Sequence, residues 1–253
     1  MRVAVAGGTG LIGRQLVALL RQSGNEPVVL ARSVGVDVTT GSGLDAALAG
    51  AEVVIDVSNV STLSKKRSVR FFTAGTEHLL DVGARAGVKH HVALSIVGID
   101  RVGWGYYQGK RSQERLIAEG PLPWTVLRAT QFHEFAGQLL DRSRGPVVLV
   151  PRLPVQPVAA REVADRLVAL ATGPAAGLAA ELAGPQVHEL ADLVRQVVRA
   201  RGQRRLVVPV RIPGGGAAHG GLLPADQADY SRGIQSFDDW LRSGGPSAGT
   251  PVS

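Results

Sequence analysis

Residues 2–13 read RVAVAGGTGLIG, and this stretch decides the fold of the chain. Its apolar beginning is typical of a buried strand in a parallel sheet. Glycines spaced three apart then turn the chain, let the backbone approach a pyrophosphate and let the helix expected at about 11–21 pack closely on the strand. Because strand, glycines and helix follow in the order that the motif requires, the stretch predicts a dinucleotide site rather than a plain turn. The expected contact residues of this turn are Gly7, Thr9, Gly10, Leu11, Ile12 and Gly13.

Strand and helix patterns alternate along the chain, which implies parallel pairing with right-handed crossovers. The expected fold is therefore α/β, with a doubly wound parallel sheet of the Rossmann type. We expect a dinucleotide-binding core over 1–130, a small α/β region over 131–243 that caps the carboxyl edge of the sheet and is integrated with the core, and a flexible tail over 244–253. The expected strands are 26–31, 35–38, 51–57, 91–95, 124–128, 147–150 and 206–210, and the expected helices are 44–48, 68–86, 106–119, 131–141, 162–171 and 189–199.

Length and composition narrow the class of protein. A chain of 253 residues can form one α/β domain with a large core. No apolar run reaches the ~18 residues that span a bilayer, and the first strand begins at once, so we expect no leader segment and a cytoplasmic location. The absence of cysteine excludes disulfides and thiolate chemistry.

The net charge of +7 raises the question of a nucleic-acid partner. The charge is scattered, with tight clusters only at 65–67 and 204–205, so a solvated surface with local attraction for an anionic cofactor is the favoured interpretation. We expect a small-molecule substrate, no nucleic-acid or membrane partner, and a monomer or homodimer. Histidines occur without the spacing of a metal site, so no metal is expected.

Polar residues after the second and fourth expected strands are candidates for further cofactor contacts. Arg32 and Ser33 stand where an NAD enzyme carries an acid for the ribose 2′-hydroxyl, and an arginine there suits the 2′-phosphate of NADP, although an exposed loop arginine is the alternative. Asp37 and Val38 are expected near the adenine, where Asp37 either contacts its amino group or serves a turn. The expected contacts with the ribose or pyrophosphate are Ser58 and Asn59, the latter equally suited to a turn.

Three residues fit a proton relay. Ser95 ends the strand expected at 91–95, and Tyr106 and Lys110 stand four apart on the next helix, so they share a face. A phenol has a pKa near ~10, and a nearby ammonium favours the phenolate. Tyr106 can then exchange a proton with a substrate carbonyl to which Ser95 donates. An ordinary surface contact between Tyr106 and Lys110 is the alternative.

The motifs GGTGLIG at 7–13, YYQGK at 106–110 and LRATQF at 127–132, together with Ser95, resemble the atypical short-chain dehydrogenase/reductases, in particular the NmrA-like and NAD(P)H-binding group. The resemblance covers roughly residues 1–240. It implies acid–base roles for the serine and tyrosine, a second role for Lys110 in holding the nicotinamide ribose, and passage of residues 128–130 along the nicotinamide.

Two departures from that pattern keep a second function open. Residues 64–90 contain no asparagine, which the superfamily often uses as a fourth catalytic residue, and Ser95 precedes Tyr106 by only eleven positions. We therefore expect an NADP(H)-dependent oxidoreductase acting on a carbonyl, quinone or similar apolar metabolite, with NAD less favoured. The alternative is a non-catalytic redox sensor that binds NADP, and an NAD-using epimerase is a third reading. Trp104, Phe132 and Phe135 can line a substrate pocket or belong to the core.

Overall fold

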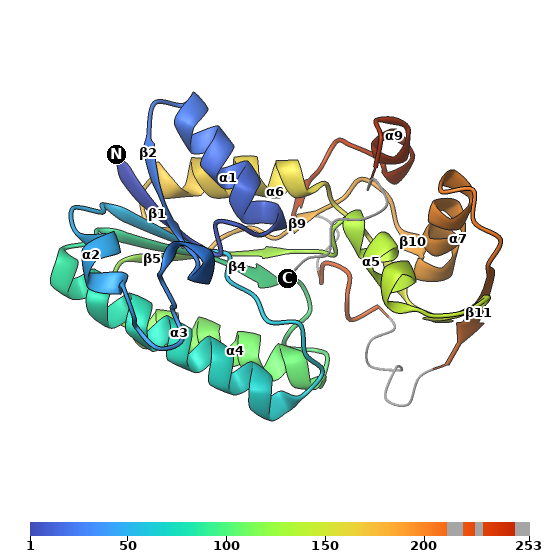
Figure 1. The fold of residues 1–253 in the computed structure, drawn as a ribbon, viewed down its shortest axis with the longest axis horizontal. Coiled ribbons are helices and arrows are strands. Elements are labelled where there is room, and N and C mark those ends of the chain that lie inside the picture. Colours follow the sequence, from blue (N-terminus) through green and yellow to red (C-terminus); the bar gives the residue numbers. More distant parts are fainter. Residues whose placement is uncertain (212–219, 226–229, 246–253) are drawn as a thin grey trace.

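A parallel sheet forms the centre of the molecule in the computed structural model, which describes residues 1–211, 220–225 and 230–245 (Figure 1). The strand order is β12-β9-β5-β4-β3-β1-β2, with β8 also paired with β5. The doubly wound class is confirmed, because β1 lies between β2 and β3 and the chain then continues outward through β4 and β5. The strands are β1 (Arg2–Ala6), β2 (Glu26–Leu30), β3 (Val53–Asp56), β4 (His90–Ile96), β5 (Trp124–Ala129), β8 (Gly177–Leu178), β9 (Leu182–Ala183) and β12 (Ser231–Arg232).

Helices cover both faces of this sheet (Figure 1). On one face α1 (Leu11–Gln22) packs beside α6 (Ala160–Ala171), and on the other α3 (Lys65–Ala86) packs along α4 (Gly105–Glu119), with the short α2 (Leu44–Leu48) next to α3. The apolar spacing of the sequence explains this arrangement, because each helix buries one stripe of side chains against the strands. In α1 the buried residues are Ile12, Gly13, Leu16, Val17 and Leu20.

The strand expected at 35–38 is wrong. Left-handed glycines at 35, 41 and 43 fold this segment back on itself, so that Asp37 and Ser42 share a single bridge and β2 remains the edge of the sheet. Val38 is buried in the core instead of extending a strand, and its carbonyl oxygen lies 2.9 Å from Nδ1 of His78 on α3. The apolar residues of the segment thus pack as part of a loop.

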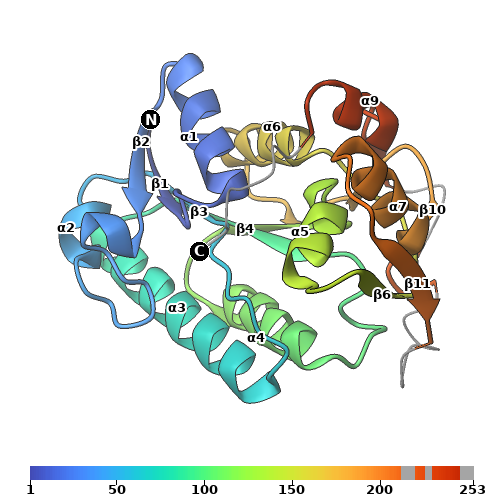
Figure 2. The ribbon, with the colours of Figure 1, turned by 45° about the vertical axis from the view of Figure 1, so that its right-hand side comes forward.

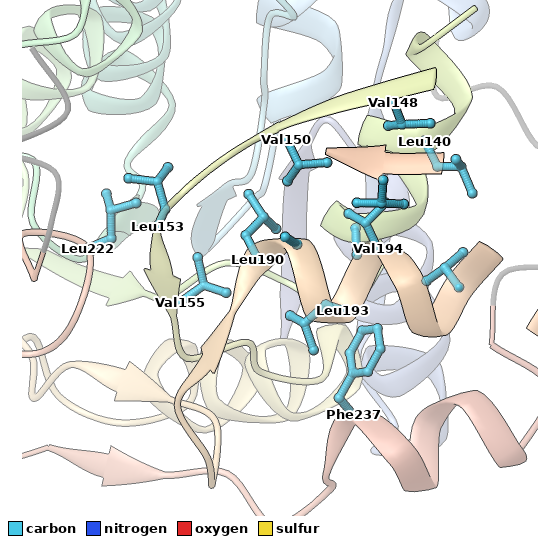
Figure 3. Close-up of a cluster of buried hydrophobic side chains, with 14 of the residues drawn as sticks. Leu140, Val148, Val150, Leu153, Val155, Leu190, Leu193, Val194, Leu222 and Phe237 are labelled. Atoms are coloured by element: carbon cyan, nitrogen blue, oxygen red, sulfur yellow. The ribbon is translucent and has the colours of Figure 1, made fainter. Parts of the chain in front are cut away.

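A second group of elements lies beside the sheet, where α5, α7, α9 and β11 gather (Figures 1 and 2). Parallel β6 and β11 and antiparallel β7 and β10 form its two small sheets, and Leu140, Val150, Leu193 and Phe237 are among the side chains of its core (Figure 3). The chain after 131 also returns to the main sheet through α6, β8, β9 and β12. The elements beside the sheet are α5 (Glu134–Arg142), β6 (Val147–Pro151), β7 (Pro154–Val155), β10 (His188–Glu189), α7 (Leu190–Ala200), β11 (Leu206–Val210) and α9 (Phe237–Arg242).

Two further expectations concern the chain as a whole. Within the described residues, no helix combines the length and the apolarity that crossing a membrane requires. The tail expected at 244–253 lies, from residue 246 onward, outside the residues that the structure describes.

Candidate functional site

The glycine turn, residues 7–13, leads from β1 into α1 at the carboxyl edge of the sheet. Gly7 has a φ of 78°, in the left-handed region, and an added Cβ would lie 2.9 Å from the Cα of Ser58. A Cβ added to Gly13 would lie 2.1 Å from the carbonyl oxygen of Gly7. At both positions the packing of the protein itself therefore requires glycine.

Gly10 differs, because the protein leaves space at this position. It is the N-cap of α1 with φ −75° and ψ −178°, and an added Cβ would approach only the Gly7 carbonyl oxygen, at 3.2 Å. The amides of Leu11, Ile12 and Gly13 find no acceptor in the described part of the chain, and no side chain caps the helix. Open amide donors at the positive end of a helix dipole fit the phosphate of a dinucleotide.

The sequence pattern did not single out Arg14, an exposed residue in the first turn of α1. Its Nη1 donates to the carbonyl oxygen of Thr9 at 2.5 Å, so the guanidinium lies on the glycine turn. It adds positive charge beside the open amides. The available signal was an arginine directly after the third glycine of the motif.

Arg32 and Ser33 begin η1 (Arg32–Val34), a 3-10 turn that follows β2. Both are exposed, and within the described ranges the Arg32 guanidinium has no hydrogen bond or ion pair. Asp37 instead accepts hydrogen bonds from the hydroxyl of Thr39 at 2.7 Å and from its amide at 2.8 Å. These bonds, and to a lesser degree the charge of Arg32, lower the pKa of the Asp37 carboxyl. Arg32 thus remains open to an anionic ligand, whereas Asp37 serves the local turn.

The loop after β3 connects the glycine turn with α4. Ser58, which packs against Gly7, is buried and donates its amide to Oδ1 of Asp56 at 2.9 Å. The next residue, Asn59, is exposed and uses its Oδ1 to accept the hydroxyl of Tyr106 at 2.7 Å. The structure therefore brings the predicted residues of three segments to one edge of the sheet.

Tyr106 and Lys110 share a face of α4 but do not bond to each other. The Tyr106 hydroxyl donates to Asn59, whereas Nζ of Lys110 donates to the carbonyl oxygen of Leu94 and to Oε1 of Gln113, each at 2.8 Å. Burial, and then the neighbouring Tyr107, raise the pKa of Tyr106. The expected lowering of this pKa by Lys110 is therefore not found in the protein alone, because desolvation of the phenolate dominates.

Ser95 lies in β4, opposite Arg128 of β5. It is 2 % exposed, and its Oγ has no hydrogen-bond partner among the described residues. Arg128 pairs with Glu114 of α4 at 2.6 Å and with Asp100 at 2.7 Å, so this arginine joins β5 to the helix that carries Tyr106. The Ser95 hydroxyl is therefore both buried and without a hydrogen-bond partner among the described residues.

Apolar side chains surround Tyr106. Trp104 and Phe135 pack with it against the core beside the sheet, whereas Phe132 packs against the core beneath α1 and α6. Two of the three expected pocket residues thus lie on the same cluster as the phenol. Within the described part of the chain, no three histidine or carboxylate side chains gather into a group that can hold a metal ion.

The sequence matches a known protein family over most of its length. A family model described as NAD(P)H-binding matches residues 7–174, from the glycine turn to just beyond the end of α6. No curated protein matched the chain.

Solved structures share the fold over nearly the whole chain. A short-chain dehydrogenase/reductase superfamily protein from Agrobacterium tumefaciens with bound NAD is 17 % identical, with a TM-score of 0.69 and coverage of 96 % of this chain and 95 % of that one. A UDP-glucose 4-epimerase from Stenotrophomonas maltophila with bound NAD is 17 % identical, with a TM-score of 0.74 and coverage of 96 % of each chain. A dTDP-4-dehydrorhamnose reductase from Clostridium acetobutylicum is 13 % identical, with a TM-score of 0.71 and coverage of 97 % and 93 %. Such identities establish the fold and leave the substrate open.

Proposed function

We propose that the chain, which belongs to the NAD(P)H-binding family, is an NADP(H)-dependent oxidoreductase of the atypical short-chain dehydrogenase/reductase type. The substrate class that fits the apolar surroundings of Tyr106 is a carbonyl compound, a quinone or a similar apolar metabolite. The observation that carries the proposal is a series of neighbouring groups along one edge of the sheet. The open amides of α1 follow the glycine turn, Ser58 packs against Gly7 of that turn, and the next residue, Asn59, accepts the hydroxyl of Tyr106.

The choice of NADP rests on Arg32. Its exposed guanidinium stands directly after β2 without a partner in the described residues, where it can bind a 2′-phosphate through two parallel hydrogen bonds. The printed sequence has no carboxylate between Leu30 and Asp37 that would favour the 2′-hydroxyl of NAD. The NAD bound in the related structures describes the cofactor of those proteins and does not decide between NAD and NADP for this chain.

In the proposed mechanism Tyr106 acts as the general acid. The nicotinamide supplies the hydride when it is bound. Tyr106 would give its phenolic proton to the oxygen of the substrate carbonyl, whose reduction yields an alcohol. Burial raises the pKa of Tyr106 in the protein alone, which makes the phenol a weaker acid, so the donor role requires bound cofactor and substrate to lower this pKa. Ser95 holds the same oxygen by hydrogen bonding, and Lys110 holds the ribose.

Cofactor titration and a substrate screen test the proposal together. We expect NADPH to bind more tightly than NADH in calorimetry, and a panel of quinones, aldehydes and ketones to include compounds that consume NADPH, as followed by its absorbance. Equal affinity for the two cofactors would contradict the role of Arg32.

One observation favours a second candidate, a non-catalytic redox sensor. The only proton of the Tyr106 hydroxyl is already donated to Asn59, and Lys110 is turned toward Leu94 and Gln113. A sensor does not require the hydrogen bonds of Tyr106 or of Lys110 to break, whereas an enzyme does. Tight NADPH binding without turnover of any compound in the panel would support this candidate over the enzyme.

A further inference from the structure

A buried chain of hydrogen bonds links Lys110 to a carboxylate that the sequence pattern did not single out. Nζ of Lys110 donates to Oε1 of Gln113, and Nε2 of Gln113 donates to Oδ2 of Asp56, each at 2.8 Å. Exposed fractions are 5 % for Lys110 and 1 % for both Gln113 and Asp56. Buried polar groups of this kind are costly unless each finds a partner, and here each does.

The orientation of the Gln113 amide is determined by its two neighbours. An ammonium only donates hydrogen bonds and a carboxylate only accepts them, so the amide oxygen must face Lys110 and the amide nitrogen must face Asp56. The neutral amide therefore stands between two buried charges and transmits the attraction of Asp56 to Lys110.

Asp56 also holds the loop that reaches Tyr106. Its second oxygen, Oδ1, accepts the amide of Ser58 at 2.9 Å, and the following Asn59 accepts the Tyr106 hydroxyl. Asp56 thus ties the position of Lys110 to the loop between the glycine turn and the phenol.

We propose that Gln113 and Asp56 are positioning residues that hold Lys110 in place and keep it protonated in the cofactor site. This inference rests on the proposed role of Lys110 in binding the cofactor. Gln113 and Asp56 act through the lysine and need not touch the cofactor.

The groups that face Lys110 determine the pKa of its ammonium. Burial lowers the pKa of Lys110 to about 8, against the opposing charges of Asp56 on β3 and Glu114 on α4. α3 contributes the ring of Phe72, whose centroid lies 4.5 Å from Nζ, and β4 contributes the Leu94 carbonyl. His91 of β4 interacts with Asp56, but burial lowers its pKa to about 4, so it is neutral throughout the range in which Lys110 loses its proton.

The pH dependence of NADPH affinity, measured by nicotinamide fluorescence between pH 6 and 10, tests the proposal. With Lys110 intact we expect affinity to fall about tenfold as pH rises through about 8, because the charge-assisted contact of the ammonium is lost. Gln113→Leu removes the link to Asp56, so the fall should begin about one pH unit lower. In Gln113→Glu the new carboxyl and Asp56 should share one proton, so that the negative charge moves next to the ammonium and the fall should begin at a higher pH. Gln108→Leu, on the same helix, is the matched control and should leave the profile unchanged.

The outcomes distinguish the proposed role of Gln113 from the proposed cofactor role of Lys110. If the fall in affinity disappears in Lys110→Met, it depends on Lys110. If it then does not move in either Gln113 variant, the proposed role of Gln113 is overturned. A profile without such a fall, or one that survives in Lys110→Met, would overturn the cofactor role of Lys110 itself. Should Gln113→Leu fail to fold, Asp56→Asn and Gln113→Glu carry the test. Competitive acylation of Lys110 at a series of pH values, without cofactor and followed by mass spectrometry, must then show the pKa of Lys110 shifting in the same direction as the fall in affinity.

Discussion

The glycine turn and the Tyr106–Lys110 face of α4 both lie at the carboxyl edge of the sheet, yet they present their polar groups in opposite ways. In the turn, the first amides of α1 have no acceptor among the described residues, and Gly10 leaves space in front of them. On α4, the Tyr106 hydroxyl and the Lys110 ammonium already bond to other groups of the protein. The proposed cofactor end is thus preformed, whereas the proposed catalytic end must exchange bonds when substrate arrives.

The difference has a physical reason. Exposed amides of a helix N-terminus are hydrated at little cost until an anion replaces the water. The buried ammonium of Lys110 cannot remain without partners, because an unsatisfied buried polar group costs about 1–3 kcal/mol. The Tyr106 hydroxyl instead bonds to the exposed Asn59 beside it. The four predictions below test this contrast, beginning with the largest expected effect.

Replacing Tyr106 by Phe should lower the rate of any reductase reaction by about two to four powers of ten, the usual share of general acid–base catalysis. NADPH affinity should hardly change, because only the hydroxyl is removed. Steady-state rates and fluorescence titration give the two quantities. Tyr107→Phe is the matched control: this neighbouring phenol is buried in the core beside the sheet and should be dispensable for turnover. A full rate in Tyr106→Phe would reduce Tyr106 to a residue of the helix surface.

Gly10→Val should weaken NADPH binding by about a hundredfold or more, because the side chain blocks several amide contacts that are each worth ~1.5–3 kcal/mol. The fold should survive, since the backbone at Gly10 is extended and an added Cβ would approach only the Gly7 carbonyl oxygen, at 3.2 Å. Calorimetry and thermal unfolding check both points. Gly173→Val, on an exposed residue after α6, should bind normally, and Gly13→Ala should destabilise the fold. Unaltered binding in Gly10→Val would place the dinucleotide elsewhere.

Arg32→Ala should reduce NADPH affinity roughly ten- to a hundredfold and leave NADH affinity nearly unchanged. The reason is the loss of one charge-assisted contact with the 2′-phosphate, worth ~1.5–3 kcal/mol. Parallel titrations with the two cofactors measure the difference. Arg21→Ala, which removes an exposed arginine near the far end of α1, controls for net charge. If both variants lose affinity equally, the effect is general electrostatic attraction rather than recognition.

Asn59→Ala has the smallest expected effect and the most direct bearing on the contrast. If Asn59 competes with substrate for the Tyr106 proton, its removal should raise kcat/KM about two- to tenfold, the equivalent of one hydrogen bond of ~0.5–1.5 kcal/mol. Asn59→Asp keeps an acceptor and should not show this gain. A loss of rate by orders of magnitude in Asn59→Ala would instead make Asn59 part of the proton relay.

The sequence by itself determined the glycine turn and the order of the longer strands and helices. These follow from local causes: the left-handed φ of Gly7, the periodic burial of α1 and the apolar runs of the parallel strands. The local pattern failed at 35–38, because left-handed glycines at 35, 41 and 43 turn this segment into a loop, in which Val36 and Val38 are buried.

Only the tertiary structure decided which groups meet the predicted relay. Asn59 bonds to Tyr106 from 47 positions away, and Asp56 bonds to Gln113 from 57 positions away. No periodicity connects residues at such separations, because the contact exists only once β3 and α4 have packed together. The same packing reversed the expected shift of the Tyr106 pKa. Spacing places a lysine on the face of a tyrosine, but burial and the surrounding acceptors determine what each can do with its proton.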